Sequence, residues 1–246
     1  MRTLSYLSIL SVVISLSGQS VAQQPDATVV FRLFWKEAHP SKYTITVHRS
    51  GQAEYVSEDP GLNPPQARNT PVESNAEQTV QSEDAASQDA LRKPFQASEA
   101  LRQKIFALAE RTHFFEGEFE FTKHAVANTG KKTLSYIDGS HKTSTTYNYS
   151  EDLSIQELTD IFQGISSTVE GGQRLEYDRR FDKLSLDQDL KALEEESNQG
   201  RLQEVQVIAP ILRRLANDRT VLHIAQMRAE RILKKAGQPV ETSAAQ

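Results

Sequence analysis

Residues 42–57 read KYTITVHRSGQAEYVS. Apolar and polar side chains alternate over the first half of this stretch, which is the pattern of a strand with one buried face. A Ser-Gly pair then turns the chain, and the last six residues predict a second strand. We expect a three-residue loop at 50–52, which would place Val47 opposite Tyr55. The stretch therefore predicts a hairpin in an antiparallel sheet.

Further strands and a helix are predicted on either side of this hairpin. Residues 27–36, ATVVFRLFWK, are rich in β-branched and aromatic side chains and predict a strand. Residues 98–112 predict a helix, because Ser98 is a good N-cap and apolar residues recur at helical spacing after it. Residues 119–149 predict a meander of three strands, with Asp138-Gly139 as a hairpin turn.

The segment 58–93 differs in composition from its surroundings. It holds four of the nine prolines and few large apolar residues, and Gln, Ser, Asn, Ala and Glu dominate it. Such a composition buries too little apolar surface to offset the entropy of ordering. We therefore expect a disordered insertion; the alternative is a docking segment that folds on a partner.

The second half of the chain is predicted to be helical. Ser154 and Glu157 fit a capping box, and the helix they begin is expected to end before Gly171-Gly172. Three more helices are predicted over 184–197, 201–217 and 221–236, and the second of them is interrupted by its proline. The polar tail 237–246 is expected to be flexible.

These elements predict an α+β fold. We expect an antiparallel sheet of about five to six strands, with helices on one face and a C-terminal helical extension. The sheet domain would comprise 23–57 and 94–172, interrupted by the insertion, and the extension would comprise 173–236.

The first 22 residues have the three parts of a secretory signal. Arg2 gives a positive start, an apolar stretch of about 13 residues follows, and Ser20-Val21-Ala22 supplies a small-x-small exit. The apolar stretch is too short for a bilayer core, which needs ~20 residues. We expect cleavage between Ala22 and Gln23, an exported product in the periplasm or outside the cell, and no transmembrane span afterwards. An uncleaved signal anchor is the alternative.

Composition excludes several classes of protein. The chain has 246 residues, a formal net charge of −5 and no cysteine. The absence of cysteine excludes disulfides, thiolate metal sites and a cysteine nucleophile. The acidic balance argues against a nucleic-acid partner.

The order of elements carries a resemblance. The stretches YTITVHRSGQAEYVS, PFQASEALRQKIFALAERTHFF, TLSYIDGSHKTSTTYNY and LSIQELTDIFQGI occur in an order that resembles small exported bacterial α+β domains of unknown function. The resemblance covers residues 28–58 and 94–169 and implies no catalytic residues. Separately, the segment from Asp218 to Ala229 resembles one helix of a HEAT-type repeat, although a single copy does not make a repeat protein.

No motif of a known active site occurs. The patterns of zinc proteases, serine hydrolases, phosphate-binding loops and dinucleotide-binding folds are all missing from the sequence. We therefore expect no catalytic, cofactor-binding or metal-binding residues. One speculative patch remains: Glu116, Glu118 and Glu120 would share one face of a strand, where they could hold a hard cation or do acid–base work. The simpler interpretation is the solvated face of that strand.

A second speculative patch lies near the C-terminus. Seven cations and two carboxylates occur between residues 211 and 235 of an otherwise acidic chain. A basic helical end of this kind could contact an anionic membrane or an acidic partner, or it could simply be a solvated helix face. The candidate residues are Arg213, Arg214, Arg228, Arg231, Lys234 and Lys235.

Three functions follow as hypotheses. We expect foremost a non-catalytic binding or interaction module of the cell envelope, whose partner is an unidentified protein or envelope component. The alternatives are an envelope-associated structural protein that uses the basic C-terminal helix, and a hydrolase that uses the glutamates at 116, 118 and 120.

Overall fold

The computed structural model describes residues 26–58 and 90–240. The predicted signal segment with its cleavage site at Ala22 and Gln23 lies outside the described residues. So do most of the predicted insertion and the last six residues of the tail.

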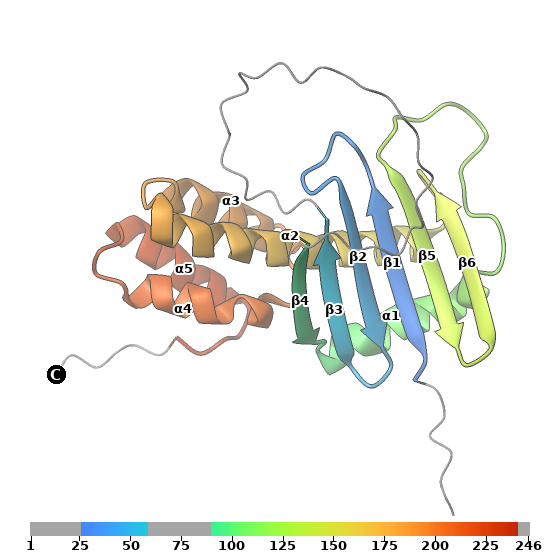
Figure 1. Ribbon diagram of the computed structural model, residues 1–246, viewed down its shortest axis with the longest axis horizontal. Coiled ribbons are helices and arrows are strands. Elements are labelled where there is room, and N and C mark those ends of the chain that lie inside the picture. The colour runs from blue at the N-terminus through green and yellow to red at the C-terminus, as the bar shows by residue number, and fades with distance from the viewer. Residues whose placement is uncertain (1–25, 59–89, 241–246) are drawn as a thin grey trace, which may run out of the picture.

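One antiparallel sheet of six strands forms the front layer of the molecule (Figure 1). The order of the strands is β4-β3-β2-β1-β5-β6, and every neighbouring pair is antiparallel. This confirms the predicted α+β class. The strands are β1 (Thr28–Phe34), β2 (Lys42–His48), β3 (Gln52–Ser57), β4 (Leu91–Gln96), β5 (Lys131–Asp138) and β6 (His141–Tyr147).

The predicted hairpin is present, but the pairing of its two strands is shifted by two residues from the predicted register. Val47 pairs with Ala53, and Tyr55 pairs with Ile45. The connecting loop does have three residues, but they are 49–51 rather than 50–52. Gly51 explains the shift, because it has a φ of 98°, which favours glycine at the end of the turn. The apolar side chains still share the buried face.

Strand β4 was not predicted, and its residues 91–93 had been assigned to the insertion. It pairs with β3 along its whole length and forms one edge of the sheet. Pro94 lacks a backbone N–H, and a strand can accept it because one side of an edge strand has no ladder to complete. The charged and polar residues around it remove the apolar alternation by which a strand is recognised in a sequence.

The predicted three-strand meander contains two strands, β5 and β6. Residues 119–127 are not a strand, although Phe121 N donates to the carbonyl of Tyr149 at 2.9 Å. The chain reaches this loop through a short left-handed turn, η1 (His113–Phe115), in which all three residues have positive φ. That turn costs backbone strain, and it accompanies the complete burial of Phe115.

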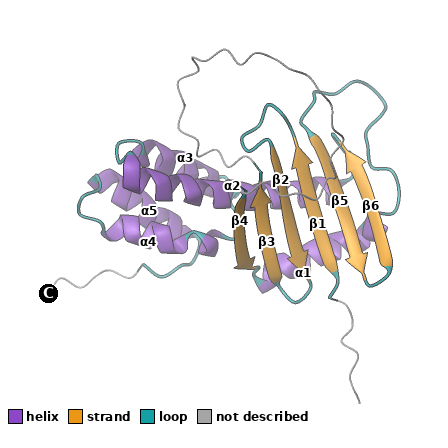
Figure 2. Ribbon diagram, in the orientation of Figure 1, coloured by secondary structure: helices purple, strands orange, loops and turns teal. Residues whose placement is uncertain are grey.

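Two helices cover the back of the sheet (Figure 2). The first, α1 (Glu99–Arg111), begins as predicted, with the Ser98 hydroxyl accepting from Leu101 N. The second, α2 (Leu153–Phe181), has 29 residues and is capped by Asp152, not by Ser154. The predicted stop at Gly171-Gly172 is therefore wrong.

The glycine pair serves packing between helices. A Cβ on Gly171 would lie 2.7 Å from Leu193 Cδ1, and one on Gly172 would lie 2.2 Å from Ile208 Cγ2. Absence of a side chain thus lets neighbouring elements approach α2 closely, while the helix continues.

The C-terminal half of α2 joins a separate helical unit. This unit adds α3 (Leu186–Asn198), η2 (Val205–Val207), α4 (Ala209–Asn217) and α5 (His223–Lys235). Pro210 lies in the first turn of α4, where its missing N–H costs nothing, so it starts a helix rather than interrupting one.

Each half of the molecule has its own core, and α2 contributes to both. The core under the sheet includes Phe31, Ile45 and Phe162, whereas the helical core includes Leu175 and Leu212. The predicted boundary between residues 172 and 173 therefore falls inside one continuous helix. Among the described residues, no helix combines the length and the apolar composition needed to cross a bilayer.

Candidate functional site

A pocket with several polar groups in its wall lies where the end of β6 meets the first turns of α2. Its volume is about 340 Å³. Its walls come from β5, from β6 and the residues that follow it, from the loop before β5, and from α2. The lining residues are Thr129, Lys132, Tyr147, Asn148, Tyr149, Ser150, Ile155, Gln156, Thr159, Asp160 and Gln163.

Lys132 forms a positive but saturated part of the pocket wall. Its side chain is buried, and Nζ donates to Thr129 Oγ1 at 2.9 Å and to the carbonyls of Asn148 at 2.8 Å and Thr129 at 3.0 Å. Burial lowers the pKa of this ammonium, and the nearby Glu120 carboxylate opposes the effect. The Gly130 carbonyl, at 3.3 Å, is a fourth acceptor for the three N–H donors of Nζ, so Lys132 fixes the loop before β5 rather than offering a free cation to a ligand.

A hydroxyl relay connects β6 to α2 at the pocket floor. The Thr159 hydroxyl donates to the Ile155 carbonyl at 2.7 Å, so its oxygen accepts the proton of Tyr147 OH at 2.6 Å. Burial raises the pKa of Tyr147, which keeps the phenol protonated for this bond. The relay holds the sheet and the helix in one fixed geometry around the pocket.

Three kinds of side-chain group in the pocket remain available to a ligand: the aromatic ring of Tyr149, the carboxylate of Asp160 and the amides of two glutamines, Gln156 and Gln163. Tyr149 is 41% exposed and stands against the edge of Phe121. Gln156 uses its Nε2 on the Ser150 carbonyl at 2.7 Å, which leaves its Oε1 as an acceptor. Asp160 and Gln163 lie on the next turns of α2. Hydrogen-bonding groups and an aromatic face thus converge on one concavity.

The predicted glutamate patch does not assemble. Glu116 lies 3.6 Å from His141 Nε2, and both side chains are more than half exposed. Glu118 and Glu120 line a separate shallow hollow of about 360 Å³, where Glu120 accepts from the backbone N–H of Asn148. The residues form a loop rather than a strand, so the expected alternation of faces is lost. Within the described part of the chain, no three His, Asp or Glu side chains are grouped to hold a metal ion.

Three of the six candidate cations of the basic C-terminal patch pair with carboxylates inside the helical unit. Arg228 contacts Asp187 at 2.9 Å and Glu194 at 2.7 Å, and Arg231 contacts Glu194 at 2.5 Å. The guanidinium groups of Arg231 and Arg228 hold the pKa of Glu194 below its ordinary value. These cations therefore join α5 to α3 instead of presenting a free basic face.

The other candidate cations are spread over the unit. Arg214 pairs with Glu176 of α2, and Arg213 Nε donates to the Pro239 carbonyl at 3.0 Å. Lys235 Nζ donates to Asn198 Oδ1 at 3.2 Å. Lys234 is exposed.

A buried polar network under the sheet was missed in the sequence. Tyr55 OH donates to Glu170 Oε1 at 2.6 Å and lies 3.3 Å from Ser166 Oγ. Tyr55 and Glu170 are both buried. The network joins β3 to the middle of α2, and only the helical spacing of Ser166 and Glu170 on the continued helix could have indicated it.

A second missed cluster lies where α2 faces α3. Asp178 is 6% exposed, the carboxyl group of Asp189 lies near it, and its Oδ2 has no hydrogen-bond partner among the described residues. Burial, followed by the hydrogen bond and charge of Asp189 and by the charge of Asp182, raises the pKa of Asp178 to about 7. Arg174 opposes the shift. A proton on Asp178 therefore stabilises the contact between α2 and α3 below neutral pH.

Asp178→Asn is expected to remove a loss of stability that the wild type suffers as pH rises from about 4 to about 7. The native state holds the proton up to about pH 7, while an unfolded aspartate releases it near pH 4, so the free energy of unfolding falls as pH rises between these values. We expect the variant to be more stable than the wild type by about 1–2 kcal/mol at pH 8 and equal at pH 4. Urea unfolding across this range checks it, with the exposed Asp160→Asn as control; an equal pH dependence in wild type and D178N would contradict the assignment.

Comparison with known proteins does not assign the chain to a family. No model of a protein family matches this chain, and no curated protein matches it. The site is therefore defined by its own geometry alone.

Proposed function

We propose that the protein is an exported, non-catalytic binding module of the cell envelope, with its ligand site in the pocket between β6 and α2. One observation carries the proposal: polar groups from strands, a loop and a helix converge on a single concavity. Its volume of about 340 Å³ lies in the range of small-ligand pockets, roughly 300–1,000 Å³. The signal-like character of residues 1–22 supports export.

The pocket chemistry favours a neutral, hydroxyl-rich ligand. Lys132 has its donors occupied, and the Asp160 carboxylate would repel an anion. Amide and carboxylate groups on α2 suit a ligand that carries both donors and acceptors. The exposed ring of Tyr149 offers an apolar face for stacking. A carbohydrate has both properties, so a glycan segment of the envelope is the proposed ligand class.

Titration with soluble oligosaccharides of N-acetylglucosamine, the uncharged sugar of bacterial envelope glycans, tests this proposal. We expect the chain 23–246 to bind them in calorimetry. Tyr149→Ala and Asp160→Ala are each expected to weaken binding about tenfold, because each removes one face of a converging site.

The matched control is Phe34→Ala. Phe34 is 44% exposed, close to the 41% of Tyr149, but it lies on β1 outside the pocket. Binding should be unchanged in F34A. Absence of heat with the wild-type chain, or an equal loss in Y149A and F34A, would refute the proposed site.

A further inference from the structure

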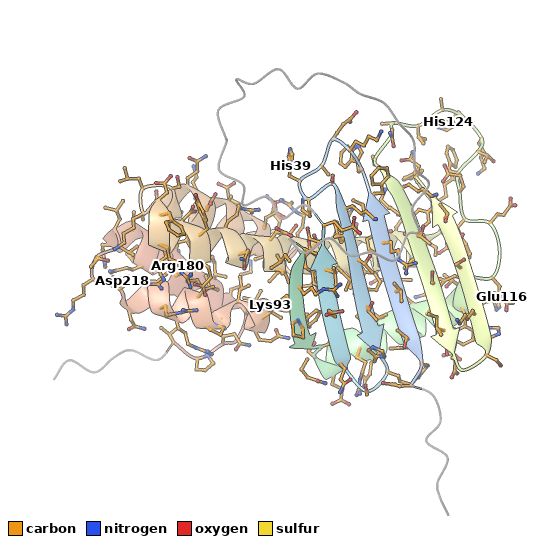
Figure 3. The ribbon with its side chains drawn as sticks, in the orientation of Figure 1. His39, Lys93, Glu116, His124, Arg180 and Asp218 are labelled. Atoms are coloured by element: carbon orange, nitrogen blue, oxygen red, sulfur yellow. The ribbon has the colours of Figure 1, made fainter. Side chains whose placement is uncertain are left out.

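Two turns lie side by side at the end of the helical unit that is farthest from the sheet. The α2–α3 turn spans 182–185 and the α4–α5 turn spans 218–222. Lys183 Nζ bridges them by donating to Thr220 Oγ1 at 2.6 Å. Figure 3 shows Arg180 and Asp218 at this end, opposite the end that carries Glu116.

Large apolar side chains gather on these turns and the helix ends beside them. Eight large apolar side chains are exposed in the described part of the chain, and half of them occur here. We call them the apolar tip: Phe181 (72% exposed), Leu184 (84%), Leu222 (54%) and Ile224 (44%). Several exposed apolar residues on adjacent turns mark a surface that contacts something other than water.

Cations surround the apolar tip. Four basic residues and three carboxylates lie within or next to the two turns: Arg179, Arg180, Lys183, Arg219, Asp182, Asp187 and Asp218. All three carboxylates have partners inside the helical unit: Asp182 contacts the Ser185 hydroxyl at 2.7 Å, Asp218 the Thr220 hydroxyl at 2.6 Å and Asp187 the Arg228 guanidinium at 2.9 Å. The tip is thus locally positive on a chain whose net charge is −5.

We infer that the apolar tip docks the protein onto the surface of an anionic phospholipid bilayer. Exposed Phe and Leu side chains at turns enter the boundary between headgroups and acyl chains, and the surrounding Arg and Lys contact lipid phosphates. A purely apolar protein interface would not need the basic rim, and a purely electrostatic one would not need the exposed leucines. The combination fits a charged lipid surface.

The docked orientation follows from α2. Phe181 is its last residue, while the pocket residues Gln156 and Asp160 lie in its first turns. A helix of 29 residues is about 43 Å long at ~1.5 Å per residue. Docking at the tip would therefore hold the ligand pocket well away from the bilayer, facing the space where envelope polymers lie. The docking itself does not depend on the proposed ligand.

Vesicle co-sedimentation of the chain 23–246 tests the inference. We expect binding to phosphatidylcholine vesicles with about 30% phosphatidylglycerol, and weaker binding to phosphatidylcholine alone or in about 1 M salt. The double variant Phe181→Ser/Leu184→Ser should reduce the partition coefficient at least about tenfold, because two apolar side chains lose their transfer into the interface.

The control is Leu153→Ser, at the opposite end of the same helix. Leu153 is 75% exposed, similar to Phe181 and Leu184, and it should be dispensable for vesicle binding. Equal vesicle binding by the wild type and the double variant would overturn the inference. So would a wild-type dimer in sedimentation velocity that the double variant abolishes in the absence of lipid, because the tip would then be an interface between copies of the chain.

Discussion

Gly164→Ala is expected to lower the free energy of unfolding by about 3 kcal/mol, even though alanine favours a helix over glycine by about 1 kcal/mol. A Cβ at this position would lie 2.3 Å from the carbonyl oxygen of Arg201, which belongs to the segment crossing α2 before α4. A backbone oxygen cannot move aside as a side-chain end can. The crossing segment must therefore shift away from α2, and contacts of both cores weaken.

The same substitution at Gly171 provides the control. There the nearest atom is Leu193 Cδ1 at 2.7 Å, the flexible end of a side chain. We expect G171A to stay within about 1 kcal/mol of the wild type, because rotamer adjustment and better helix propensity offset each other. Urea unfolding of both variants measures the difference, and equal stabilities of G164A and G171A would contradict the packing argument.

Tyr55→Phe is expected to cost about 2 kcal/mol of stability. The phenol is fully buried, and its proton satisfies Glu170 Oε1 at 2.6 Å. Removing the donor leaves a buried carboxyl oxygen with one partner fewer and frees no space for water. Burial, with the adjacent Glu170, raises the pKa of Tyr55, so the phenol keeps the proton that it donates at neutral pH.

Tyr136→Phe is the matched control for this network. Tyr136 lies on β5, and the one hydrogen-bond partner of its hydroxyl within residues 26–58 and 90–240 is the exposed Asp138, at 3.3 Å. Loss of that bond should cost no more than about 0.5 kcal/mol, since water replaces it. Thermal or chemical unfolding compares the two variants. A similar loss of unfolding free energy in both would show that the buried Tyr55–Glu170 bond stabilises the protein no more than an exposed one.

Local patterns in the sequence were sufficient for most of the sheet and for the start of α1. Alternation predicted β2 and β3, aromatic and β-branched content predicted β1, and Ser98 marked the helix start. These features depend on residues that are close together in the sequence, so they can be recognised without knowledge of the fold. The hairpin register required more, because it depended on which residue could adopt the positive φ at position 51.

Features that depend on distant contacts were missed. The glycines of α2 resembled a helix end, yet their function is close approach of Leu193 and Ile208. No local pattern marks Lys132, yet its buried ammonium donates to backbone carbonyls of the loop before β5 and of the segment after β6. The pocket is defined by the meeting of β6 with α2, which no local pattern encodes.

The basic C-terminal patch shows how composition can mislead. Counting charges along residues 211–235 indicated a free cationic face, but Asp187 and Glu194 of α3 pair with Arg228 and Arg231 across the interface. Sequence separation of more than thirty residues hides such pairs. The cations near exposed apolar residues lie on two turns and in the last turn of α2.

The shared helix also makes the two cores thermodynamically one system. If the helical unit unfolded alone, α2 would lose its packing partners near Leu175 while the same helix stayed buried near Phe162. Neither half can therefore unfold without disturbing the other. Cooperative unfolding in a single transition is the natural result. By linkage, a ligand held at the first turns of α2 would raise the melting temperature of helices that it never touches.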